Sequence, residues 1–247
     1  MATINLFFQQ EFSLHLVTNI IKTEIKKDKL RILLTETLAE TENPEGGDIG
    51  DIFWPQGNLK FTRVFRTQNG DIWHEGILNG NRPNPNTPCS IEIDSYNRLH
   101  NSAYHSFSHL ITGIARRLLK KDFIGTSKKF SDYGILTLKA QKDALPAASE
   151  IWQSALEYIN KPAPIERLVL SKEKALSIAG TFFQSVIPAN ASEIRLIKVG
   201  HDLAWIPCRG VHLRDLGQIS SVENSPKLSA WTEDEDLCFN YHLTFHQ

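Results

Sequence analysis

The chain has 247 residues, of which 41% are hydrophobic and 22% charged, and its net charge is −1. This profile is typical of a globular protein with one large domain or two modest ones, and it excludes a strongly basic nucleic-acid coat protein. Three cysteines exclude a disulfide-dense secreted scaffold, and no apolar run approaches the roughly 18 residues of a membrane helix. The first residues carry no basic group before their apolar stretch, unlike a signal peptide. We therefore expect a cytoplasmic protein with reduced thiols and no membrane partner.

Residues 1–92 are predicted to form a β-rich domain. The segments 30–37 and 59–67 are short and rich in leucine, aromatic and β-branched residues, as strands are. Asn69-Gly70 follows the second segment and predicts a hairpin turn. Residues 79–88 contain three prolines and four asparagines, which predict a loop and a candidate boundary because proline fixes φ and lacks a donor.

Helical spacing dominates the chain after this loop. Apolar residues over 101–121 recur at about 100° per residue, which predicts a helix. A second helix is predicted over 143–160, and a third over 172–187 with Ser171 as its N-cap. Alternating patterns predict strands at 193–199 and 237–245.

Charged residues are unevenly distributed along the chain. No lysine or arginine lies between Arg31 and Lys60, whereas six acidic residues do. A basic cluster follows the first predicted helix and comprises Arg116, Arg117, Lys120, Lys121, Lys128 and Lys129. The simplest interpretation of both stretches is a solvated face.

Two histidines in the first predicted helix have the spacing of metal ligands. His105 and His109 are separated by one helical turn, so both imidazoles can reach one ion. They lie roughly 160° around the helix from Phe107, the centre of the apolar stripe, and are therefore not core histidines. The alternative to a metal site is a pair of solvent-exposed histidines.

A second candidate ligand pair follows about a hundred residues later. Cys208 and His212 are also spaced i and i+4, and Pro207 and Gly210 favour a turn there. A thiolate and imidazoles are ligand types that zinc prefers, and three or four such ligands with an open position suit a catalytic zinc ion. The alternative is that neither pair binds metal.

The remaining cysteines and nearby histidines are not assigned as ligands. Cys89 and Cys238 have no partner at ligand spacing, and Cys238 is expected to be buried in a strand. His100 and His201 are interpreted as residues that flank the two motifs.

These motifs resemble the editing domain of alanyl-tRNA synthetase and its free-standing relatives, the AlaX-type trans-editing proteins. The likeness extends from about residue 10 to residue 245. It is carried by the segments 70–76, 94–98, 101–102, 105–111, 207–212 and 216–219.

The resemblance implies a fold and an activity. The implied fold is α+β, with a small N-terminal β-barrel-like domain over 1–92. A zinc-binding two-layer α/β editing core with an antiparallel sheet follows over 93–247. The implied activity is hydrolysis of serine or glycine wrongly esterified to the tRNA for alanine.

The resemblance also implies roles for individual residues. The zinc ion (Zn2+) is expected to bind His105, His109, Cys208 and His212. No general base is assigned, and a zinc-bound water is the expected nucleophile. The acceptor-stem phosphates of tRNA are expected to contact Arg116, Arg117, Lys120 and Lys121.

The sequence departs from the family pattern beside the expected site. The region 37–50 keeps Asp48-x-Gly50 but lacks the family's Gly-Gly-Gly-Gln run. Arg209 stands in place of a glycine, and Val211 in place of a threonine. Two alternatives follow: a degenerate editing domain that binds zinc and tRNA without catalysis, or a zinc hydrolase of another small ester or amide.

Overall fold

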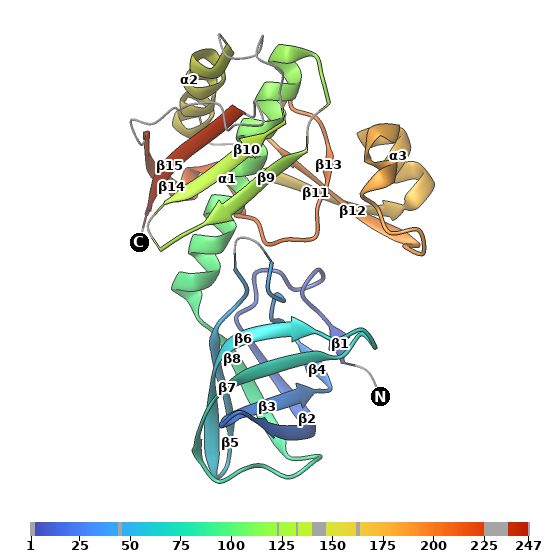
Figure 1. The fold of residues 1–247 in the computed structure, drawn as a ribbon, viewed down its shortest axis with the longest axis vertical. Coiled ribbons are helices and arrows are strands. Elements are labelled where there is room, and N and C mark those ends of the chain that lie inside the picture. Colours follow the sequence, from blue (N-terminus) through green and yellow to red (C-terminus); the bar gives the residue numbers. More distant parts are fainter. Residues whose placement is uncertain are drawn as a thin grey trace. The chain divides into compact units, whose positions relative to one another are not determined.

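The structure is a computed structural model that describes residues 3–43, 46–122, 124–131, 133–139, 147–161, 164–224 and 237–246. It divides into two compact units, residues 1–101 and residues 102–247. Figure 1 shows the strands of the first unit and the helices and sheets of the second. The domain boundary predicted after residue 92 stays a prediction.

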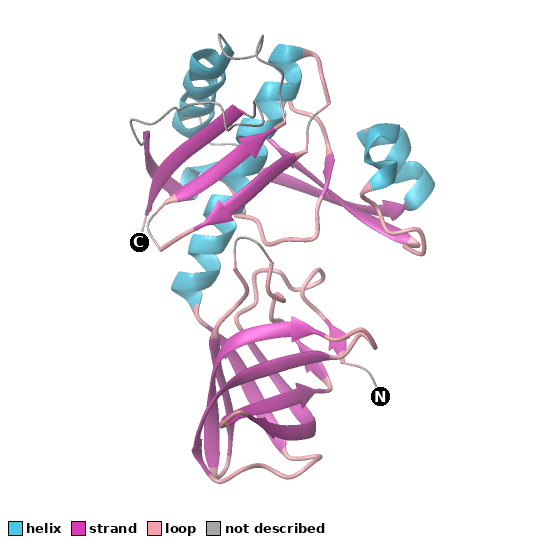
Figure 2. Ribbon diagram, in the orientation of Figure 1, coloured by secondary structure: helices cyan, strands magenta, loops and turns pink. Residues whose placement is uncertain are grey.

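The first unit is built around a closed antiparallel barrel with the strand order β2-β3-β7-β6-β5-β8. A short parallel pair, β1 with β4, accompanies the barrel strands. Figure 2 shows this part of the chain as strands joined by loops. The strand bounds are β1 (Ile4–Asn5), β2 (His15–Lys26), β3 (Lys29–Leu34), β4 (Glu36–Thr37), β5 (Gly50–Trp54), β6 (Gly57–Arg66), β7 (Ile72–Gly80) and β8 (Pro88–Ile93).

The strand segments and the turn predicted in this unit are confirmed. Segment 30–37 forms β3 and β4, and segment 59–67 lies in β6. The turn between β6 and β7 contains Gly70 at φ +89°, a conformation that glycine adopts without strain. The loop after β7 lies inside the first unit, because β8 follows it and pairs with β2 and β5.

A buried ion pair fixes the loop that precedes β5. Arg98 Nε donates to Asp48 Oδ1 at 2.8 Å and Nη2 donates to Oδ2 at 2.5 Å. The same guanidinium donates to the carbonyl oxygens of Glu11 and Leu38. Asp48 is 0% and Arg98 5% exposed. The interpretation of the acidic stretch as a solvated face is therefore wrong for Asp48, because a distant arginine compensates its charge.

His74 is a buried histidine in the barrel. Its Nε2 lies 2.9 Å from Thr37 Oγ1, its Nδ1 lies 3.3 Å from the Ile32 carbonyl oxygen, and its ring meets the Phe61 ring edge-on. Burial lowers the pKa of His74 to about 4.

The lowered pKa makes the stability of the protein depend on pH. An unfolded chain protonates this histidine below about pH 6.5, whereas the folded chain resists protonation until about pH 4. Unfolding should therefore become easier as pH falls through this window, by about 3 kcal/mol in total. Urea unfolding of the wild type and of His74→Gln between pH 7 and pH 4 measures the effect. Equal pH dependence in both proteins would contradict it.

The second unit contains two antiparallel sheets and the helices α2 and α3, together with most of α1. One sheet is four-stranded with the order β14-β15-β10-β9, and the other is three-stranded with the order β11-β12-β13. The element bounds are α1 (Ser95–Leu119), β9 (Gly125–Lys129), β10 (Gly134–Leu138), α2 (Ala147–Asn160), β11 (Ile165–Ser171), α3 (Lys172–Ala179), η2 (Thr181–Ser185), β12 (Glu193–Val199), β13 (Ile206–Pro207), η3 (Leu216–Gln218), β14 (Ile219–Asn224) and β15 (Leu237–Phe245).

The four-stranded sheet packs against helices. Phe107 of α1 contacts Trp152 of α2 and Tyr241 of β15, and Trp152 stacks on Phe239. Alternate residues of β15 point inward, which explains the apolar alternation seen in its sequence. The predicted strands at 193–199 and 237–245 are confirmed as β12 and β15.

The first predicted helix begins six residues earlier than expected. Asp94 Oδ1 accepts a hydrogen bond from the Asn97 N–H and so caps the helix before Ser95. The first turn is polar, so it carries no apolar period that could reveal it. The second helix, α2, is described from Ala147, and residues 143–146 of its predicted span lie outside the described residues.

The third helix is shorter than predicted. Ser171 caps α3 as expected, with its side chain accepting from the Lys174 N–H. The helix ends at Gly180, whose φ is +99°, and a short 3-10 turn, η2, follows. A single helix over 172–187 was therefore wrong, because glycine accommodates the left-handed backbone that terminates α3.

The predicted fold class is confirmed. The chain is α+β, with a closed antiparallel barrel followed by helices and antiparallel sheets. Among the described residues, no helix combines the length and the apolar character needed to cross a membrane.

Candidate metal centre

Two segments of the second unit bring four candidate ligands together. Helix α1 carries His105 and His109, and the loop after β13 carries Cys208 and His212. Their ligand atoms all lie within 4.8 Å of one another. His105 Nε2 is 3.0 Å and His212 Nε2 is 3.3 Å from Cys208 Sγ. In tetrahedral zinc centres the donor atoms lie about 3.5 Å apart, so this cluster could hold a metal ion.

The two helix histidines do not lie on a solvent-exposed face. Helix α1 is buried on nearly all sides between His100 and Ala115, and His105 and His109 are only partly exposed. Thr112 of the same helix is also buried, and its Oγ1 donates to the Ser108 carbonyl oxygen. This burial could not be predicted from the apolar pattern, because several buried residues of α1 are polar and form hydrogen bonds inside the protein.

Cys208 lies in an environment that favours its thiolate. Burial raises the pKa of the thiol, but the charges of His105, His109 and His212 together lower the pKa well below its usual value. The Gly210 N–H also donates to Cys208 Sγ at 3.4 Å. Metal ligation requires this deprotonated form.

The imidazoles also fit a metal ligand set. His212 is buried, and this burial lowers its pKa well below the usual value, a direction that favours the neutral ring required for ligation. The Nδ1 atom of His109 is buried without a hydrogen-bond partner among the described residues. A buried nitrogen without a partner is costly, and a metal ion would satisfy the ring it belongs to.

Ser106 contributes to the site, although the sequence analysis assigned it no role of its own. Its Oγ lies 3.2 Å from His212 Nδ1 and accepts a hydrogen bond from the Leu213 N–H at 3.1 Å. This contact leaves His212 Nε2 directed at Cys208. Such contacts fix the tautomer and orientation of a metal-binding imidazole.

Two arginines hold the loop that carries Cys208 and His212. Arg195 of β12 donates to the Gly210 carbonyl oxygen at 2.7 Å, and the Cys208 N–H donates to the Arg195 carbonyl oxygen at 3.0 Å. Arg167 of β11 donates to the carbonyl oxygens of His212 and Leu213. The strands β11 and β12 thus position a loop that has no regular structure of its own.

The other cysteines and histidines singled out from the sequence do not join this cluster in the described part of the chain. Cys89 and Cys238 are buried, as expected for Cys238, and burial raises the pKa of Cys89 to about 12. His100 is buried and stacks on Tyr96, whereas His201 is exposed.

Comparison with known proteins gives two relatives. An "Alanyl-tRNA editing protein AlaX-L" from Pyrococcus horikoshii is 23% identical over 221 residues, which are 88% of this chain and 52% of the relative. An "Alanine--tRNA ligase" from Methanopyrus kandleri is also 23% identical, over 88% of this chain and 24% of the relative. The resemblance to AlaX-type alanyl-tRNA editing proteins is confirmed. This chain spans about half the length of AlaX-L, and no protein-family model matches it.

Residues from two separate segments that resemble the AlaX-type proteins contact each other in the first unit. Asp48 belongs to the retained Asp48-x-Gly50 segment and Arg98 to the segment at the start of α1, and the two form the buried ion pair. Asn101 Nδ2 also donates to the Gly47 carbonyl oxygen at 3.2 Å. The retained part of the glycine-rich region is thus tied to the first turns of α1.

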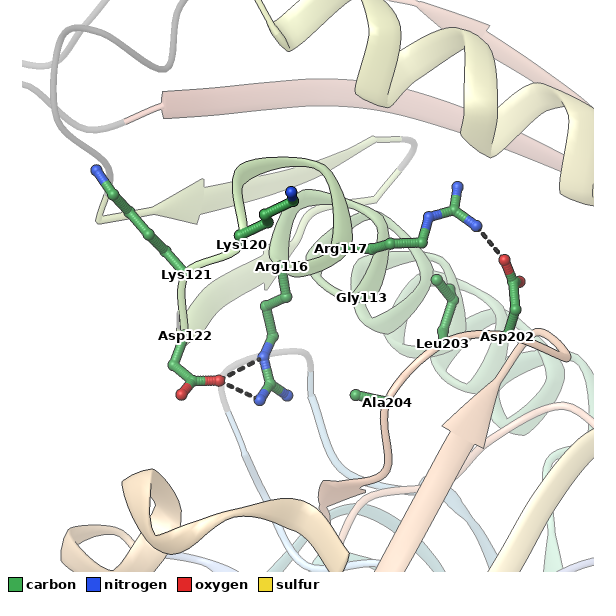
Figure 3. A pocket seen from close by; sticks show the side chains of 9 residues that line it. All are labelled: Gly113, Arg116, Arg117, Lys120, Lys121, Asp122, Asp202, Leu203 and Ala204. Atoms are coloured by element: carbon green, nitrogen blue, oxygen red, sulfur yellow. Dashed lines mark hydrogen bonds and ion pairs between the residues drawn. The ribbon is translucent and has the colours of Figure 1, made fainter.

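The basic residues expected to bind tRNA surround a pocket of about 390 Å³ at the end of α1 (Figure 3). The pocket is also lined by Asp122 and Asp202. Arg116 forms an ion pair with Asp122, and Arg117 with Asp202. Two acidic residues thus face four basic ones, so the lining keeps an excess of positive charge. The solvated-face interpretation is wrong for Arg116, whose side chain is only 9% exposed.

Proposed function

We propose that this chain is a zinc-dependent hydrolase that deacylates mischarged tRNA in trans, with serine or glycine on the tRNA for alanine as the expected error. The observation that carries the proposal is the convergence of four nitrogen and sulfur ligands from segments about a hundred residues apart. The likeness to an alanyl-tRNA editing protein over 88% of this chain supports the substrate class. We place the activity in the cytoplasm.

The residues of the site have separate tasks in this proposal. His105, His109, Cys208 and His212 would hold the zinc ion, which in such sites polarises a carbonyl group and lowers the pKa of a bound water. Ser106 would keep the ring of His212 in the ligating orientation. Arg167 and Arg195 would keep the Cys208 loop at a fixed distance from α1. We assign no protein side chain as general base.

Binding of tRNA is assigned to the basic pocket lining. Arg116 and Arg117 form ion pairs with Asp122 and Asp202, which partly neutralise their charges. Lys120 is exposed, so its charge is available to an RNA phosphate. Arg116 also lies over the Phe183 ring at 4.8 Å, which gives it a structural role in addition. The lysines are therefore the better residues for a test.

Charge reversal at Lys120 and Lys121 should weaken tRNA binding without unfolding the protein. Phosphate contacts release counterions, so each contact contributes about 0.7–0.9 to the slope of log affinity against log salt. We expect the double variant Lys120→Glu/Lys121→Glu to lower this slope by about 1–2, because up to two contacts are lost. The measurement is a salt titration of the affinity for tRNA.

A matched control is available on the hairpin between β2 and β3. Lys26 and Lys27 are adjacent and exposed, so Lys26→Glu/Lys27→Glu makes the same charge change elsewhere. If both double variants lower the affinity equally, only net charge matters and the pocket is not the binding surface.

The proposed activity is tested with the zinc-loaded protein and the tRNA for alanine charged with serine, glycine or alanine. We expect hydrolysis that selects weakly between the seryl and alanyl esters. Val211 is buried where the family has a threonine, and the Gly-Gly-Gly-Gln run is absent, so polar groups that could recognise a serine hydroxyl are missing. Apolar bulk alone discriminates only about 10- to 200-fold, whereas a site that hydrogen-bonds a substrate group can exceed 10⁴-fold.

The same departures favour two other outcomes that the assay separates. Tight tRNA binding without hydrolysis of any ester would indicate a degenerate editing domain that keeps zinc and tRNA. Hydrolysis of small esters or amides without any effect on charged tRNA would indicate a zinc hydrolase with another substrate. Strong selection for the seryl ester would show that Val211 and the missing glycine run do not set specificity.

A further inference from the structure

The hairpin formed by β9 and β10 carries two aromatic rings on its tip. Phe130 and Tyr133 are 39% and 36% exposed. Their rings are stacked, with centroids 4.5 Å apart and an interplanar angle of 8°. The Phe130 N–H donates to the Tyr133 carbonyl oxygen at 2.8 Å and closes the hairpin.

The strand register places these rings on the outer face of the hairpin. Leu136 and Leu138 are fully buried, so they define the inner face. Lys128 pairs with Ile135 on the opposite face, and the alternation of side chains puts Phe130 and Tyr133 on that face too. Lys128 is exposed, so the outer face combines aromatic rings with a positive charge.

The inner face of the hairpin packs against α1. Gly125, at the start of β9, lies against Thr112 of α1, because a Cβ there would be 2.6 Å from Thr112 Oγ1. Gly134, beside the tip, lies against the ring of Tyr104. Thr112 and Tyr104 are separated by about 12 Å along the helix axis. Tyr104 directly precedes His105, so Gly134 contacts the same turn of α1 that carries a candidate ligand.

We propose that Phe130 and Tyr133 form a stacking platform for an unpaired base in the 3′ tail of tRNA, with Lys128 beside a backbone phosphate. This inference rests on the proposed function, because an ester on the 3′ end must reach the ligands while the paired stem stays outside. Unpaired bases stack on aromatic side chains, and adjacent lysines neutralise the phosphates. The basic pocket at the end of α1 and the rings at the tip would then contact successive parts of one RNA.

The test compares two forms of tRNA, one complete and one without its unpaired 3′ nucleotides. The variant Phe130→Leu/Tyr133→Leu keeps apolar bulk on the hairpin and removes both ring faces. Stacking of one base accounts for roughly a 5- to 150-fold change in affinity. We expect the leucine variant to bind complete tRNA more weakly by this factor. Its affinity for the shortened tRNA should equal that of the wild type.

Two further variants make the test specific. Phe130→Trp keeps a stacking surface and should bind complete tRNA at least as tightly as the wild type. Phe182→Leu removes an aromatic ring of similar exposure, 38%, from η2 and should have no effect. Thermal unfolding of every variant checks that the second unit remains folded.

The outcomes separate this inference from the proposed function. If the leucine variant binds complete tRNA like the wild type, or loses equal affinity for both forms, the platform is overturned while deacylation by the wild type still supports the function. If the wild type neither binds tRNA nor hydrolyses the ester, the function and the platform are both wrong.

Discussion

Replacing both histidines of α1 should abolish zinc binding while leaving the fold intact. The variant His105→Ala/His109→Ala keeps only Cys208 and His212, which lie on one loop and supply two of the four ligands. Two ligands cannot complete the coordination that zinc requires. Alanine is the strongest helix former, so α1 should persist. Elemental analysis should show a fall from about one zinc ion per chain to nearly none, and any deacylation should fall to background.

The control for this prediction is a histidine outside the cluster. His201 is exposed, so His201→Ala should retain full zinc content. The zinc content of Ser106→Ala should lie between those of these two variants. Loss of a residue that hydrogen-bonds to a metal ligand typically weakens metal affinity about 10- to 100-fold. Full zinc retention by the double histidine variant would remove α1 from the metal site.

Breaking the buried ion pair in the first unit should have the largest effect on stability. Asp48→Ala removes the two carboxylate acceptors of the Arg98 guanidinium, leaving only its carbonyl acceptors, and also removes the acceptor of the Glu40 N–H. The guanidinium would remain buried without the carboxylate that contributes most to its compensation. Removing one partner of such a pair typically costs about 3–5 kcal/mol. Urea unfolding, with the free energy extrapolated to water, measures this loss.

The double variant Asp48→Ala/Arg98→Met separates charge burial from lost packing. Methionine removes the unpaired charge, so the double variant should be more stable than Asp48→Ala alone. If Asp48→Ala costs less than about 1 kcal/mol, water reaches Arg98 and the pair is not a principal support of the loop.

The candidate ligands are easier to recognise in the sequence than the residues around them. His105 with His109, and Cys208 with His212, are local patterns that can be recognised without knowing the fold. Ser106, Arg167 and Arg195 support the site through contacts between residues 15 to 107 positions apart, and no local pattern indicates these contacts. Such partners emerge only when the strands and helix are assembled.

The same distinction between local and distant contacts explains where the observed fold agrees with the predicted one and where it differs. The Asn69-Gly70 turn and the Ser171 cap depend on neighbouring residues, and both were predictable. The pairing of Asp48 with Arg98 joins residues 50 positions apart and contradicts the expectation that acidic residues of a polar stretch are solvated. The burial of α1 was equally hidden, because its polar residues bond to each other and to β15.

The separation of the ligands along the chain has a consequence for folding. His105 and Cys208 are 103 positions apart, so an ion held between them would act as a cross-link that closes a loop comparable to those closed by long-range disulfides. In the chain-entropy description, a cross-link of this span lowers the entropy of the unfolded chain and so raises its free energy by roughly 4–5 kcal/mol. The loop it closes contains α2, α3, β11 and β12, whereas the barrel strands lie wholly outside it. Chelation should therefore lower the melting temperature of the second unit and leave that of the barrel nearly unchanged.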